Sequence, residues 1–134
     1  GLIMQTLRDD FNFIPSNDIV GDCGVMLAFS FETRDAAQRF IKSAEADGIY
    51  SVSPIDTGKH VYTHWTPIIE KRGAFNPKMD PFKMEENQAL NFNCTPDACP
   101  KTLDILAKTV YISVDPDWSD DDIAKMIELI KRWR

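Results

Sequence analysis

The sequence predicts a single α+β domain with a small mixed sheet of about three strands and helices packed on one face of it. Apolar and polar residues alternate along residues 24–32 and again along 110–115, as in strands with one buried face. Apolar residues recur at helical spacing after each of these two segments. With 134 residues and 43% hydrophobic content, the chain can bury one respectable core, so we expect one domain.

The first half of the chain predicts a strand, a helix and a second strand. Residues 1–13 are moderately apolar and fit the tail of a helix or a linker, whereas residues 15–21 fit a loop. Thr33 can cap the helix that follows the first strand, and Gly48 stands where a left-handed C-terminal cap is needed. Residues 49–53 are then expected to form a return strand that lies parallel to the first one.

The last third of the chain predicts a short helix, a strand and a longer helix. Pro100 suits the first turn of the short helix, because its missing N–H would have no partner there. After the strand, Ser119 and Asp122 have the spacing of a capping box, and the acidic residues after Ser119 favour the positive end of the helix dipole. The apolar stripe of this helix consists of Ile123, Met126, Ile127, Ile130 and Trp133.

The middle of the chain holds both histidines, in a cluster with two aromatic residues, Tyr62 and Trp65. His60 and His64 could bind a metal if they stood on a helix, but no Glu follows His60 as a zincin-type motif requires. We therefore predict no metal site. Residues 74–93 are expected to be a long irregular connection, which is either functional or an ordered surface excursion.

Composition excludes several classes of function. The formal net charge is −6, and an acidic chain without a basic cluster is poorly suited to bind nucleic acid or an anionic membrane surface. No apolar run approaches the length of a membrane span, and the amino terminus lacks the parts of a signal peptide. The three cysteines, Cys23, Cys94 and Cys99, favour reduced thiols in a cytoplasmic protein over a disulfide framework, and their spacing does not fit a zinc site.

No nucleophile with its base, glycine-rich phosphate loop or metal cluster can be assembled from these residues. The order of several short motifs nevertheless resembles the C-terminal small domain of the DegT/DnrJ/EryC1/StrS family, which are sugar aminotransferases with the fold of aspartate aminotransferase. The matching features are a GDxG turn before the first strand, a DGI step after the first helix, a histidine after the second strand, a CP step before the short helix, and a TVxIxxxPxWSDxDI signature. In this chain they are Gly21, Asp22 and Gly24; Asp47, Gly48 and Ile49; His60; Cys99 and Pro100; and residues 109–123. The HVYTHW segment departs from the more common YPxPLH form of the family, which leaves the substrate open.

The resemblance implies a reaction in which pyridoxal phosphate accepts an amino group, usually from glutamate, and delivers it to a keto sugar. In the family, the Schiff-base lysine and the phosphate-binding residues belong to a large domain, so the resemblance implies that this chain is a fragment without cofactor-binding residues of its own. Residues 1–13 would be a remnant of the connection from that missing large domain, and 14–134 the small domain. The full-length enzyme would be a homodimer. His60 matches the family's active-site histidine and is the expected substrate-binding residue, with Tyr62 and Trp65 as neighbours.

Two other classes of function remain open. A free-standing regulatory domain of ferredoxin-like type that binds a small metabolite has the same strand–helix–strand elements. Such a module should begin near its first strand, whereas a severed one should carry an unpacked stub at residues 2–13. The third class is an interaction module whose exposed apolar face binds a protein.

Overall fold

The structure is a computed structural model that describes residues 1–91 and 93–133 of the chain. The strands are β1 (Asn12–Phe13), β2 (Met26–Ser30), β3 (Ser51–Val52) and β4 (Thr109–Ser113). The helices are α1 (Leu2–Leu7), α2 (Arg34–Ala46), α3 (Thr66–Ile69), α4 (Glu85–Gln88), α5 (Pro100–Ala107) and α6 (Asp120–Arg132), and three 3-10 turns are η1 (Pro54–Asp56), η2 (Tyr62–His64) and η3 (Pro77–Met79).

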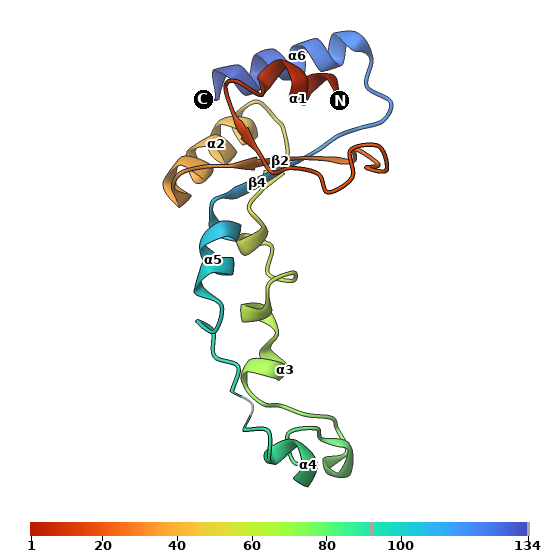
Figure 1. The fold of residues 1–134 in the computed structure, drawn as a ribbon. Helices are drawn as coiled ribbons and strands as arrows, with labels where there is room; N and C mark the ends of the chain where they lie inside the picture. Colours follow the sequence, from red (N-terminus) through yellow and green to blue (C-terminus); the bar gives the residue numbers. More distant parts are fainter. Residues whose placement is uncertain (92, 134) are drawn as a thin grey trace.

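The chain forms two parts, a body and an arm (Figure 1). The body, residues 1–53 and 108–133, holds the sheet together with α1, α2 and α6. The arm, residues 54–107, leaves the sheet at the end of β3, runs away from the body to a tip that contains α4, and returns through α5 to β4.

The four strands form one antiparallel sheet in the order β1-β2-β4-β3. The predicted α+β class is confirmed, but the predicted mixed sheet of about three strands is wrong. β2 and β3 do run in the same direction, as the crossover through α2 requires, yet β4 lies between them and is antiparallel to both. The result is a split β-α-β unit, to which the short β1 adds a fourth strand.

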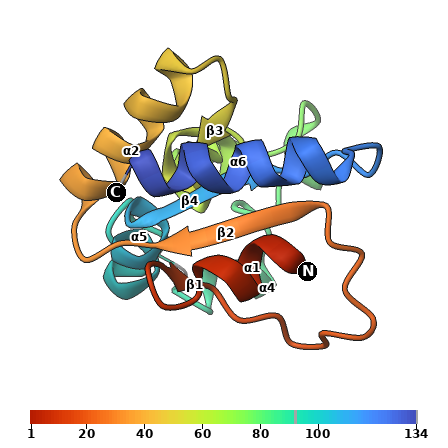
Figure 2. The same cartoon turned by 90° about the horizontal axis from the view of Figure 1, so that it is seen from above.

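One face of the sheet carries the core. Leu27 and Phe29 of β2 are buried and alternate with more exposed neighbours. In β4, Val110 and Ile112 are buried on either side of the half-buried Tyr111. Helices α1, α2 and α6 supply the other core residues, and Figure 2 shows α1 and α6 lying across this face. Their buried residues are Ile3, Leu7, Ala37, Phe40, Ala44, Met126, Ile127, Ile130 and Trp133. The predicted apolar stripe of α6 is thereby confirmed, with Ile123 packed at its margin.

Both predicted helix caps are confirmed. Thr33 Oγ1 accepts a hydrogen bond from Ala36 N at 3.1 Å at the start of α2. Ser119 and Asp122 form the full capping box of α6, in which Ser119 Oγ accepts from Asp122 N and Asp122 Oδ2 accepts from Ser119 N. Both long helices therefore begin where the local sequence places them.

Asp47 joins the C-terminal ends of α2 and α6. Its Oδ2 accepts a hydrogen bond from Trp133 Nε1 at 2.6 Å, and its Oδ1 lies 2.6 Å from a guanidinium nitrogen of Arg132. The Trp133 hydrogen bond, followed by the one from Arg132, holds the pKa of Asp47 below its usual value. The next residue, Gly48, has a φ of 76°, which confirms the predicted left-handed cap.

Residues 1–13 are part of the body rather than an unpacked stub. Ile3 and Leu7 stand four residues apart, so they share one face of α1, and both are buried where α1 packs on α6. Asn12 then pairs with Ser30, which makes β1 an edge strand of the sheet. The packed domain thus includes residues that the sequence analysis assigned to a connection before residue 14.

Replacement of Ile127 or Ile130 by Ala should reduce the free energy of unfolding by about 2 to 5 kcal/mol, because both side chains fill the core between α6 and the sheet. Ile105→Ala is the control, since that side chain is 57% exposed and should change stability by less than about 0.5 kcal/mol. Chemical denaturation measures all three. If the core variants unfold at the same denaturant concentration as the parent, the apolar stripe of α6 does not stabilise the body.

The Asp47 contacts should make stability depend on pH in a defined direction. The pKa of Asp47 is lower in the folded than in the unfolded chain, so its stabilisation is complete above the unfolded pKa of about 4 and is lost as pH falls through the folded pKa. The Tm of Asp47→Asn should therefore lie below that of the parent at pH 7 and converge with it in acid. Glu45→Gln, two residues earlier on exposed surface, is the control and should track the parent throughout. A gap between Asp47→Asn and the parent that persists unchanged at low pH would contradict the account.

Candidate functional site

The three predicted site residues lie in one segment of the arm near the body. His60 precedes η2, Tyr62 begins η2, and Trp65 follows it. The segment is anchored by Val61, whose side chain is only 2% exposed. His60 itself is exposed, and no described residue makes a hydrogen bond or ion pair with its imidazole. The imidazole is therefore free to contact a ligand.

Trp65 closes the loop that contains His60. Its Nε1 donates a hydrogen bond to Lys59 O at 3.1 Å, which ties the residue after η2 to the residue before His60. Trp65 remains 50% exposed. It thus both shapes the loop that contains His60 and leaves part of its aromatic side chain accessible to solvent.

Tyr62 joins the two limbs of the arm. Its hydroxyl donates to Pro96 O at 2.9 Å and accepts from Cys99 N at 3.0 Å. A phenol has one proton to donate, and that proton is committed within the chain. Tyr62 therefore fixes the arm in place, and a ligand could contact its ring but could not receive its proton without breaking the link to Pro96.

Asp80 organises the tip of the arm, although no motif in the sequence marks it as a functional residue. The residue is 4% exposed in an otherwise exposed segment. Its carboxylate accepts from Phe82 N at 3.0 Å and lies 3.3 Å from Lys83 Nζ. A Cβ on Gly73 would overlap this carboxylate, so a larger residue at this position would displace Asp80. The Asp80-Pro81 pair is a local turn signal, but its contact with Gly73 could not be foreseen.

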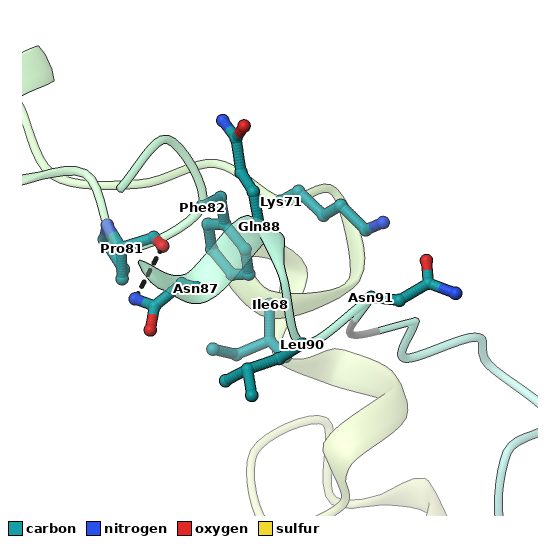
Figure 3. A pocket seen from close by; sticks show the side chains of 8 residues that line it. All are labelled: Ile68, Lys71, Pro81, Phe82, Asn87, Gln88, Leu90 and Asn91. Atoms are coloured by element: carbon teal, nitrogen blue, oxygen red, sulfur yellow. Dashed lines mark hydrogen bonds between the residues drawn. The ribbon is translucent and has the colours of Figure 1, made fainter. Parts of the chain in front are cut away.

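A hollow of about 430 Å³ lies in this tip, between the helical turns α3 and α4. Figure 3 shows the side chains that line it. The ring of Phe82 and the side chains of Ile68 and Leu90 make its apolar part, and Lys71 is its one cationic side chain. A hydrogen bond of 2.8 Å from Asn87 Nδ2 to Pro81 O holds the wall. The remaining lining residues are Pro81, Asn87, Gln88 and Asn91.

A second hollow, of about 440 Å³, lies on the body next to the end of α6. Phe11, Phe31 and Trp133 give it aromatic walls, and Arg39 of α2 stands at its edge. Arg39 forms no ion pair with any residue that the structure describes. The other charged lining residues are Asp10, Glu32 and Arg132, of which Arg132 is paired with Asp47.

The described residues do not fit pyridoxal phosphate. A site for this cofactor needs a lysine for the Schiff base and an acidic partner for the pyridine nitrogen in one cavity. The tip hollow has Lys71 but no carboxylate, whereas the body hollow has carboxylates but no lysine. We therefore derive no chemical step through the cofactor on this chain.

Other site chemistries also find no support in the part of the chain that the structure describes. No group of three or more His, Cys, Asp or Glu side chains is arranged to hold a metal ion within residues 1–91 and 93–133. Cys23, Cys94 and Cys99 are all free. None of the described helices is long and apolar enough to cross a membrane.

Comparison with known proteins supplies no name for this site. No protein-family model matches the chain, and a search of curated proteins found no match either.

Replacement of Tyr62 by Phe should loosen the base of the arm, because it removes both hydrogen bonds between the limbs. Each lost bond should lower the local opening free energy by roughly 0.5 to 1.5 kcal/mol. Hydrogen exchange should accelerate at Cys99 N–H and its neighbours, while the melting of the body stays unchanged. Tyr50→Phe is the matched control, since Tyr50 is 73% exposed. Equal exchange in both variants would show that Tyr62 does not join the limbs.

Proposed function

We propose that this chain is the C-terminal small domain of a pyridoxal-phosphate-dependent aminotransferase that transfers an amino group, from glutamate, to a keto sugar. The proposal rests on the ordered motif series in the sequence. The observation that carries it is the exposed His60 imidazole, which stands on a tied loop without a partner among the described residues. A side chain kept available in this way suits contact with a substrate.

Several motif residues occupy positions that the fold itself needs. Gly48 has a positive φ, Asp47 binds the end of α6, and Cys99 and Pro100 begin α5. Asp22 accepts a hydrogen bond from Gly24 N at 2.8 Å in the turn before β2. These residues support the proposed similarity to the fold of the family. Because their roles are structural, His60 is the motif residue that we propose contacts the substrate.

In the proposed enzyme, His60 would act on the sugar rather than on the cofactor. A protonated imidazole can donate to a sugar hydroxyl or phosphate, and a neutral one can accept a proton, so a histidine side chain is suited to either role. Trp65, which closes the same loop and is half exposed, offers a flat apolar surface of the kind on which a sugar ring packs.

The proposal requires partners that the chain does not contain. The cofactor would be held by a large domain of the same protein, and the full-length enzyme would be a homodimer. A cytoplasmic location is proposed with it, because the cysteines are free and reduced thiols are typical of that compartment.

One observation favours a second candidate, a free-standing domain that binds a small metabolite. The amino-terminal segment is packed in the body, whereas a connection severed from a large domain is expected to be unpacked. The body hollow then becomes the binding site, with Arg39 facing an anionic group and Phe11, Phe31 and Trp133 facing an apolar one.

The chain of residues 1–134, mixed with pyridoxal phosphate, should give no new absorbance band and no lysine label after borohydride reduction, because its residues do not fit the cofactor. An antibody against the chain should detect a much larger protein in extracts of the source cells, and that protein should carry the cofactor. A cellular protein of 15.3 kDa without cofactor would contradict the first proposal and leave the second.

In that larger protein, His60→Ala should reduce the rate of the half-reaction with keto sugar by about tenfold or more, while the half-reaction with glutamate and the cofactor absorbance stay nearly unchanged. His64→Ala is the matched control, since His64 is also exposed and lies four residues along. A loss shared by both half-reactions, or no loss with sugar, would remove His60 from substrate binding.

A further inference from the structure

The hollow on the body has aromatic walls that the fold holds in place. Phe11, Phe31 and Trp133 form these walls. Each of the three rings packs on Phe40, with ring centroids 6.0, 5.1 and 5.4 Å from that of Phe40, respectively. Phe40 is only 1% exposed and is fixed within the close-packed core. The apolar part of the hollow is therefore preformed, so a ligand that binds there loses little free energy to rearrangement of the protein.

One side of α2 forms another wall and brings polar groups to the hollow. Ala36, Arg39 and Ser43 follow one another at intervals of three and four residues, so they lie on the same side of the helix, and all three line the hollow. The Ser43 hydroxyl makes no hydrogen bond with any described residue. The helix thus offers a guanidinium and a hydroxyl next to the aromatic walls.

The described charged residues that line the hollow are two of each sign. Arg132 is paired with Asp47, and Asp10 is engaged in an interaction of its own. Arg39 and Glu32 also line the hollow, yet they form no ion pair with each other or with any other described residue. Both side chains are exposed and can be reached from solvent. The hollow therefore offers one guanidinium and one carboxylate to a ligand.

A ligand that matches these walls carries one group of each charge beside an apolar body. A guanidinium binds a carboxylate through two parallel hydrogen bonds, and a carboxylate in turn accepts hydrogen bonds from an ammonium group. A ligand with only an anionic group would leave Glu32 without a partner, and a ligand with only a cationic group would do the same to Arg39. A carboxylate, an ammonium group and an apolar side chain on one carbon atom make a free α-amino acid.

We propose that the body hollow binds a free α-amino acid with an aromatic side chain. Arg39 holds the α-carboxylate, Glu32 holds the α-ammonium group, and the aromatic side chain packs among Phe11, Phe31 and Trp133. The volume of about 440 Å³ is in the range of small-molecule sites. The inference rests on the second candidate function and assigns its ligand to one chemical class.

Isothermal titration calorimetry of the purified chain with L-phenylalanine should show saturable binding of one molecule per chain, with a dissociation constant of about 10 µM to 1 mM. 3-Phenylpropionate lacks the ammonium group and phenethylamine lacks the carboxylate, so each should bind about tenfold or more weakly. L-Alanine has both charged groups but only a methyl side chain, and it should also bind about tenfold or more weakly.

Variants connect each charge of the ligand to one residue. Arg39→Gln should weaken the binding of L-phenylalanine about tenfold or more and leave that of phenethylamine unchanged. Glu32→Gln should weaken the binding of L-phenylalanine to a similar extent without weakening that of 3-phenylpropionate. Lys42→Gln and Glu45→Gln remove exposed charges of α2 outside the hollow, so these controls should bind like the parent. All four positions are exposed, and the melting temperatures should match that of the parent.

Three results would overturn the inference. The first is no binding of L-phenylalanine at concentrations up to about 10 mM. The second is binding that neither Arg39→Gln nor Glu32→Gln weakens. The third is equal binding of 3-phenylpropionate that depends on Arg39, because the hollow would then be a site for anions; that result would leave the second candidate function standing. The size of the cellular protein tests that candidate separately.

Discussion

The body of this protein depends on the packing around Phe40. Its ring centroid lies 5.1 to 6.0 Å from those of Phe31, Phe29, Trp133 and Phe11, so one side chain of α2 contacts the sheet, the end of α6 and the segment before β1. Asp47, at the C-terminal end of α2, strengthens the same junction through Trp133 and Arg132. Because α2 is fixed in this way, β3 is held at the sheet edge next to β4, and both ends of the arm start from neighbouring strands.

The parts of the fold that could be predicted are those whose signals are local. The Thr33 cap, the Gly48 turn and the Ser119 capping box each lie within a few residues of the helix they bound. The strand order could not be predicted, since the insertion of β4 between β2 and β3 depends on contacts across the whole chain. β1 was missed because two residues are too few to show an alternating pattern.

In the candidate site, too, only the features with local signals could be predicted from the sequence. Sequence drew attention to His60, and the structure leaves that side chain exposed, but the role of Tyr62 depends on Pro96 and Cys99 in the opposite limb. Asp80 and Gly73 could not be found from spacing either, since they meet only when the tip folds. The arm thus differs from the body in kind: polar contacts to the backbone hold it, and much of its apolar surface faces outward.

Native-state hydrogen exchange measured residue by residue tests this division most directly. The account predicts that the amides of β2, β4, α2 and α6 exchange together at the slowest rate, that of global unfolding, because they share the core around Phe40. Amides in the tip of the arm, residues 66–91, should exchange faster and independently of the body, and Phe40→Ala should accelerate the body far more than the tip. Tip amides that are as slow as those of β4, and that accelerate with them in Phe40→Ala, would contradict the account.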